Sequence, residues 1–158
     1  MWKKIKPYVI SILIALGVGG LSALLTMGNM DIYDNIQTPP LSPPSFLFPL
    51  VWTVLYILMG ISAAIIYVKQ DNNFHEARLG FRAYTISLIF NFLWSILFFN
   101  MQAFGFSFFW LLGLLFFIIK TIVSYYRVDP LAAYLQIPYA VWVAFAGYLN
   151  FGIWMLNM

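Results

Sequence analysis

The chain has 158 residues, of which 63% are hydrophobic, 20% aromatic and only 8% charged. A soluble domain of this length cannot bury so much apolar surface, so the composition indicates an integral membrane protein. The absence of cysteine excludes disulfides and thiolate metal sites, and the few basic residues, with a net charge of +3, form no nucleic-acid-binding patch. We therefore expect no metal, no cofactor and no nucleic-acid partner.

Five apolar runs follow one another along the chain, each near the roughly 20 residues that a helix needs to cross a bilayer. We predict an all-α integral membrane protein, a bundle of five transmembrane helices over about residues 5–27, 46–69, 79–100, 104–126 and 131–157. Residues 1–158 then form a single transmembrane domain, multi-pass in the cell membrane. If the N-terminus is inside, the Lys and Arg residues fall at or toward the inner face, so the positive-inside rule predicts the N-terminus inside and the C-terminus outside.

Stripes of small residues in the first and last predicted helices indicate close helix contacts, because packing drives helix association in lipid. The stripes are Ala15, Gly19 and Ala23 in the first helix, and Ala140, Ala144 and Gly147 in the last.

One connection is long: residues 28–45, GNMDIYDNIQTPPLSPPS, which we call the lid loop. The DIYDNIQ half can form one helical turn, whereas four prolines within TPPLSPP exclude a helix there. The aromatic Tyr33 and the apolar Leu41 predict that the loop packs onto the bundle as a stiff cap. A rigid connector without further function is the alternative.

The acidic residues argue against several activities, because all five lie in loops or at helix ends: Asp31, Asp34, Asp71, Glu76 and Asp129. Proton-coupled transport usually needs a carboxylate within the membrane. No Ser-His-acid triad, paired carboxylates or metal-ligand spacing is present, and the lone His75 lies in a polar break.

Aromatic and amide side chains recur at helical spacing in three of the predicted helices. The faces are Trp52, Tyr56, Met59 and Ala63; Tyr84, Ser87, Asn91, Trp94, Ser95 and Phe98; and Pro138, Trp142, Phe145, Ala146 and Leu149. If they converge beneath the lid loop, they form a pocket for a flat apolar ligand. Asn91 is costly facing lipid, so it either bonds a neighbouring helix or lines a cavity.

Three stretches, VWTVLYILMG (51–60), NFLWSILFF (91–99) and VDPLAAYLQIPYAVWVAFAGYLN (128–150), resemble the TspO/MBR family of tryptophan-rich sensory proteins and translocator proteins. The resemblance covers about residues 33–150. It implies a five-helix membrane bundle, often a homodimer, whose pocket opens toward the first long loop. It also implies binding of porphyrins such as protoporphyrin IX, of haem, and of isoquinoline carboxamide and benzodiazepine-type ligands.

Some bacterial members of this family are associated with light-dependent degradation of protoporphyrin through pocket tryptophans, which correspond to Trp52 and Trp142. These two are the catalytic candidates if the chemistry is photo-oxidative. Together with the helix faces above, the resemblance gives these ligand-binding candidates: Tyr33, Pro43, Pro44, Trp52, Tyr56, Asn91, Trp94, Trp142, Phe145, Ala146 and Leu149.

The chain departs from the family pattern at several positions. Leu41 stands where relatives commonly have tryptophan in the loop, Ile32 replaces another frequent tryptophan, and Ser87 replaces glutamine. Phe151 stands at the tyrosine of the animal cholesterol motif and no basic residue follows it. Cholesterol binding is therefore not expected.

Three functions follow from this reading. The leading hypothesis is a membrane-embedded tetrapyrrole-binding protein for sensing, transport or disposal of porphyrins. The second is an enzyme that degrades the bound porphyrin with light and oxygen. The third is a small-molecule or lipid transporter, which the missing intramembrane acid and the absence of an internal repeat disfavour.

Overall fold

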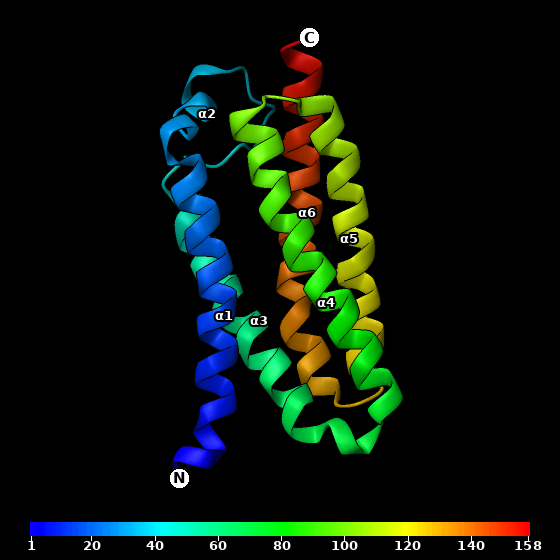
Figure 1. Ribbon diagram of the computed structural model, residues 1–158. Coiled ribbons are helices and arrows are strands. Elements are labelled where there is room, and N and C mark those ends of the chain that lie inside the picture. The colour runs from blue at the N-terminus through cyan, green and yellow to red at the C-terminus, as the bar shows by residue number, and fades with distance from the viewer.

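The computed structural model describes residues 1–158 and contains helices and loops but no strands (Figure 1). Five helices are long and apolar enough to cross a membrane, which confirms the predicted fold class. They are α1 (Trp2–Thr26), α3 (Leu47–Lys69), α4 (Phe74–Ser95), α5 (Phe104–Tyr126) and α6 (Pro130–Leu156). The protein is therefore a multi-pass membrane protein.

Shorter elements lie between them. The DIYDNIQ segment forms the single turn α2 (Ile32–Asn35), as the sequence predicted, and a π-helical turn over Ile96–Asn100 follows α4. The lid loop and the C-terminus lie at one end of the bundle, here called the loop end, and the N-terminus lies at the other, the N-terminal end (Figure 1).

The predicted bounds are wrong mainly at the start of α4, which begins at Phe74 and not at 79. Asn73 caps this helix, because its side-chain oxygen accepts a hydrogen bond from the Glu76 backbone N–H at 3.3 Å. The extra turn is polar, so it lies outside the apolar run from which the helix was predicted. Asp129 caps α6 in the same way, accepting from the Leu131 N–H at 2.9 Å.

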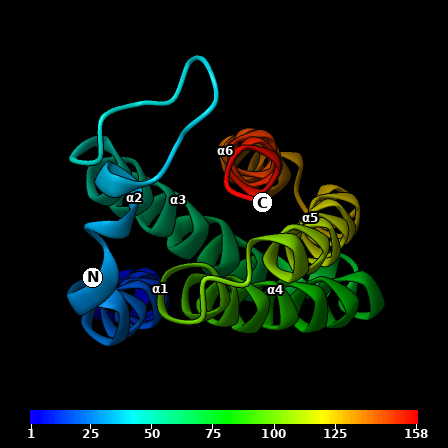
Figure 2. The same ribbon diagram turned by 90° about the horizontal axis from the view of Figure 1, so that it is seen from above.

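Viewed from the loop end, the helices form a ring in the order α1, α3, α6, α5, α4, in which α1 also touches α4 (Figure 2). Although α3 and α4 are consecutive in the chain, they barely touch. The gap in their packing leaves room between α1, α3 and α4.

Close helix contacts do involve small residues, including Gly19 of the predicted stripes, but the four-residue stripes do not stay buried along their whole length. Gly60 of α3 lets the backbone of α1 approach at Ile12, and Gly19 of α1 lies against the Tyr56 ring. Ala23 and Ala144 are exposed instead, because four-residue steps drift by about 40° each around a helix of 3.6 residues per turn. Seven-residue and eleven-residue steps stay on the buried face, which is why Ser22 and Thr26 in α1 are buried with Ala15.

Two ion pairs close the N-terminal end: Lys69 with Asp129, and Arg127 with Glu76, whose atoms are 2.8 Å apart. The hydrogen bond from the Lys69 ammonium holds the pKa of the Asp129 carboxyl below its ordinary value. Both carboxylates are therefore engaged by cations from neighbouring elements.

Candidate ligand-binding site

A small pocket of about 80 Å³ lies beneath the lid loop, enclosed by α2, α3, α4 with its π-helical turn, and α6. Most of its walls are aromatic. Eleven side chains line it: Tyr33, Phe48, Trp52, Trp94, Ser95, Phe98, Phe99, Ala146, Leu149, Asn150 and Ile153. Five of the predicted site residues, Tyr33, Trp52, Trp94, Ala146 and Leu149, are thus brought together here.

The roof of the pocket is held by Tyr33 of α2. Its hydroxyl donates a hydrogen bond to the Pro43 carbonyl at 2.8 Å, and its ring meets Phe48 edge-on with centroids 4.9 Å apart. Burial raises the pKa of the Tyr33 phenol, so the group remains a neutral donor. Pro44 lies next to this contact, and its carbonyl accepts from the Leu47 N–H at the start of α3.

The lid loop is fastened to α6 at three points. Tyr148 donates a hydrogen bond to the Pro40 carbonyl at 2.7 Å. The Asn157 amide exchanges two hydrogen bonds with the Gln37 backbone, at 2.8 and 3.1 Å. Pro39 is buried against Gly152, where any Cβ atom would collide with the proline ring.

Leu41 does not pack onto the bundle, contrary to the prediction, because its side chain is 85% exposed. It lies at the tip of the loop with a φ of 69°, a conformation that glycine or asparagine adopts more readily. The loop is therefore held down by Tyr33, by Pro39 and by its backbone carbonyls.

The floor beneath the pocket is a buried hydrogen-bonded group. Asn91 is 2% exposed, and its amide donates to the hydroxyls of Tyr56 at 3.1 Å and Tyr139 at 3.2 Å. Trp52 packs against both tyrosines, with centroid distances of 5.6 and 6.2 Å. Asn91 thus joins α4 to α3 and α6, and it supports the pocket without lining it.

One side wall is fixed by a second polar cluster around Asn150 of α6. Its side-chain oxygen accepts from the Trp94 indole N–H at 3.0 Å and from Ser107 at 3.1 Å, while its amide donates to the Phe104 carbonyl at 2.8 Å. The plane of the Trp94 ring is therefore locked, because its single polar atom already has a partner.

Trp142 and Phe145 do not line this pocket. Trp142 lies behind Phe48, with ring centroids 5.9 Å apart, and packs on Phe145 at 5.5 Å. Its indole N–H is buried and has no acceptor within the chain. Such an unpaired donor is costly, so the site behind Phe48 favours an acceptor that the chain itself does not supply.

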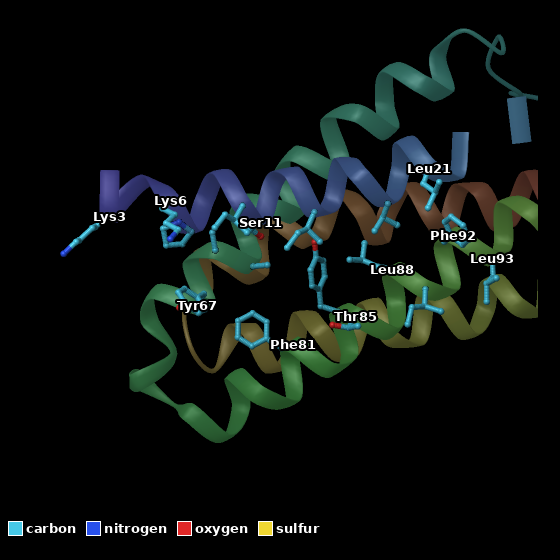
Figure 3. A pocket seen from close by; sticks show the side chains of 18 residues that line it. Lys3, Lys6, Ser11, Leu21, Tyr67, Phe81, Thr85, Leu88, Phe92 and Leu93 are labelled. Carbon is cyan, nitrogen blue, oxygen red and sulfur yellow. The ribbon is translucent and has the colours of Figure 1, made fainter. Parts of the chain in front are cut away.

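A second and much larger cavity, of about 990 Å³, opens between α1, α3 and α4 toward the N-terminal end (Figure 3). It is mostly aliphatic, and none of the predicted ligand-binding residues lines it. Neither helical spacing nor any motif predicted this cavity, which we call the α1/α4 groove, since it arises from the weak contact between the consecutive helices α3 and α4.

The family model described as TspO/MBR family matches residues 10–155, nearly the whole bundle. The chain belongs to the TspO/MBR family. It is 35% identical to the tryptophan-rich protein TspO of Chlorobaculum tepidum over 99% of both chains. It is 36% identical to the TspO of Archaeoglobus fulgidus, over 94% of this chain and 95% of that one. The similarity extends to the bovine translocator protein, with 33% identity over 88% of this chain and 83% of that one.

For this TspO/MBR chain, Ser95 and Phe98 lie on a helix face that the sequence predicted to form the pocket, but sequence reasoning missed four other lining residues: Phe48, Phe99, Asn150 and Ile153. Two of these residues could have been predicted from the sequence. Phe48 lies one turn before Trp52 on the same face, and Asn150 is an amide in an apolar helix, as Asn91 is. The neighbours Phe98 and Phe99 both reach the pocket from the wide π-helical turn, which no periodicity analysis anticipates.

Proposed function

We propose that this protein binds porphyrin-type tetrapyrroles, including protoporphyrin IX and haem, at the loop end of the bundle, and serves their sensing, transport or disposal. One observation carries the proposal: six aromatic rings from four elements converge on a single cavity beneath a proline-stiffened loop. Aromatic faces stack on flat apolar ligands, and a cavity with a few fixed polar groups is the usual form of a small-molecule site.

The ligand enters only if the site opens, because a cavity of about 80 Å³ is well below the ~300–1,000 Å³ typical of ligand pockets. Movement of the lid loop with Phe48 would enlarge it toward Trp142, whose indole N–H lacks an acceptor. A carboxylate or nitrogen acceptor on the macrocycle would complete that hydrogen bond. Trp142 thus joins Trp52 in contacting the ligand.

The remaining residues have distinct roles under this proposal. Ala146 and Leu149 leave room for the macrocycle, Phe145 extends the aromatic wall, and Pro43 and Pro44 stiffen the roof. Tyr56 and Asn91 act beneath, by fixing the orientation of Trp52. The same pocket suits flat isoquinoline carboxamide-type ligands, and we extend the proposal to a homodimeric assembly in the membrane.

The test is titration of the purified full chain with protoporphyrin IX in the dark, following the porphyrin absorption band. Trp142→Phe removes the indole donor and is expected to weaken binding about tenfold, within the range for a buried hydrogen bond to a charged acceptor. Trp2→Phe is the matched control, because Trp2 is exposed at the opposite end. Unchanged affinity in Trp142→Phe and in Trp52→Phe would refute the proposed site.

A second function, light-driven oxidation of the bound porphyrin with oxygen as the oxidant, is favoured by one feature. Trp52 lies in a contiguous group of oxidisable rings with Tyr56 and Tyr139. Illumination of the complex in air should then yield a defined product that Trp52→Phe and Trp142→Phe reduce. Equal bleaching in empty detergent would count against this function and leave the binding proposal intact.

A further inference from the structure

The loop-end pocket is bounded on one side by the line of contact between α3 and α6, hereafter the α3/α6 seam (Figure 2). Hydrogen bonds close the half of the seam nearer the N-terminal end. Ser62 donates to the Ala132 carbonyl at 2.7 Å, and the Gln136 amide donates to Ser62 at 3.2 Å. In the loop-end half, beyond the level of Tyr56 and Tyr139, no hydrogen bond joins the two helices, so packing alone holds them together.

The other helix contacts around the pocket are fixed more firmly. Asn150 joins α6 to the start of α5, and the Asn100 amide donates to the Leu25 carbonyl at 3.0 Å, which joins the π-helical turn to α1. Between α1 and α3, Gly19 lies directly against the Tyr56 ring. The loop-end half of the α3/α6 seam can therefore open without breaking a hydrogen bond between helices.

A row of aromatic rings leads across this half of the seam, from the pocket to the outer face of α6. Phe48, which lines the pocket, lies 5.9 Å from Trp142 between ring centroids. Phe145 lies 5.5 Å from Trp142 and 6.1 Å from Tyr148. Exposure increases along the row, since the first three rings are half-buried and Tyr148 is 43% exposed. A flat ring system can stack on each ring of the row in turn.

The seam carries no charged side chain. In α3 the first charged residue is Lys69 at its end, and α6 has none between Pro130 and Leu156. A lipid head group or another ion finds no ionic partner there, and burial of an unpaired charge is costly. The seam therefore favours apolar molecules that are dissolved in the hydrocarbon region of the bilayer.

Pro138 gives α6 a point at which its loop-end half can bend. It lies inside the helix, four residues before Trp142, and proline has no N–H to donate to the Tyr134 carbonyl. Sharp helix kinks occur mainly at such positions. The lid loop reaches from α2 and α3 toward α6 at the loop end of the seam, where Tyr148 holds the Pro40 carbonyl (Figure 2). Lifting of the loop therefore also frees the seam.

We propose that the loop-end half of the α3/α6 seam is the entry site through which a flat, apolar ligand dissolved in the bilayer reaches the loop-end pocket. The ligand stacks first on Phe145 and Tyr148, and then passes between Phe48 and Trp142 as α6 bends at Pro138. The buried Trp142 N–H becomes reachable only when these rings part, so its hydrogen bond forms at the end of the path. This inference rests on the proposed function, because it names the source of the ligand for the same pocket.

The experiment is stopped-flow mixing of protoporphyrin IX with the full chain in lipid nanodiscs, following tryptophan fluorescence. Dilution into excess empty nanodiscs gives the dissociation rate. Pro138→Ala restores the missing backbone hydrogen bond of α6, so both rates should fall about fivefold at an unchanged Kd, because the bend is needed for passage and not for the bound state. Pro7→Ala makes the same change inside α1 and should leave both rates unchanged.

A second pair of variants tests the seam itself. Val51 is half-buried and lies one turn after Phe48 on the same side of α3, so Val51→Trp fills the seam beside that ring. Both rates should fall several-fold with little change in Kd. Val54→Trp adds the same ring at a position of α3 that is 50% exposed, and it should have no effect.

Three results would overturn the entry site while leaving the pocket intact. One is an association rate unchanged in either Pro138→Ala or Val51→Trp, or slowed equally in its control. Another is slower association at an unchanged dissociation rate, which would place these residues in the bound complex. The third is conversion of a dimer to a monomer by Val51→Trp, since a second copy would then cover the seam. Absence of saturable binding by the unmodified chain would instead refute the proposed function.

Discussion

The two cavities of this bundle differ in nearly every property that governs access. The pocket at the loop end is small, aromatic and roofed, and hydrogen bonds fix its floor and one wall. The α1/α4 groove is more than ten times larger, mostly aliphatic, and open along its side (Figure 3). Cavity size alone would therefore favour the groove, whereas the porphyrin site that we propose is the smaller pocket.

The difference has a cause in the helix packing. At the loop end, α3, α4 and α6 are joined through Asn91 and Asn150, which bring rings from separate helices into one cluster. From Asn91 toward the N-terminal end, no further side-chain hydrogen bond joins α3 to α4, and the two helices stay apart. A specific site forms where polar side chains hold helices in register, and a lipid-accessible groove remains where nothing does.

Loss of the pocket floor should have the largest effect. Asn91→Ala removes two buried interhelical hydrogen bonds, so we expect the free energy of unfolding in detergent to fall by about 2 kcal/mol. Thr85→Val, which removes a hydroxyl from the groove, should change the free energy of unfolding by less than about 0.5 kcal/mol. Comparable losses in both variants would show that the groove is as highly ordered as the pocket.

Displacement of the lid loop comes next. Gly152→Val places a side chain where Pro39 packs, so the loop must lift from α6. We expect the association rate of protoporphyrin IX, measured by stopped-flow absorption, to rise several-fold. Gly20→Val is the control, because a side chain at Gly20 meets no other atom within 4 Å. If Gly152→Val leaves the association rate unchanged, ligand does not enter beneath the lid loop.

A single fastening of the loop should have a smaller effect. Tyr148→Phe removes the hydrogen bond to the Pro40 carbonyl, which is worth about 1 kcal/mol and hence about a fivefold increase in the open population. Hydrogen exchange of the loop amides would measure it. Tyr134→Phe, on an exposed part of the same helix, provides the comparison. Equal protection of the loop amides in both variants would show that the Tyr148 hydroxyl does not hold the lid loop to α6.

Sequence reasoning reached the fold because five apolar runs leave no alternative in a membrane. It also placed Trp52 and Trp94 in one pocket, since helical spacing puts them on inward faces, and it added Tyr33 of the lid loop through the family resemblance. It failed for Leu41, which stays outside while Pro39 is buried, because loop conformation depends on contacts with α6 that no local pattern encodes. The α1/α4 groove was missed because it depends on how closely α3 and α4 pack, which no local pattern encodes either.

The central claim, that the small loop-end pocket and not the large groove holds the porphyrin, can be tested with three alanine or threonine substitutions. Ala146→Phe fills the pocket, Thr85→Phe fills the groove, and Ala144→Phe adds the same ring on the exposed face of α6. Protoporphyrin IX titration should show binding lost in Ala146→Phe and kept in the other two. Binding lost in Thr85→Phe and kept in Ala146→Phe would contradict the account.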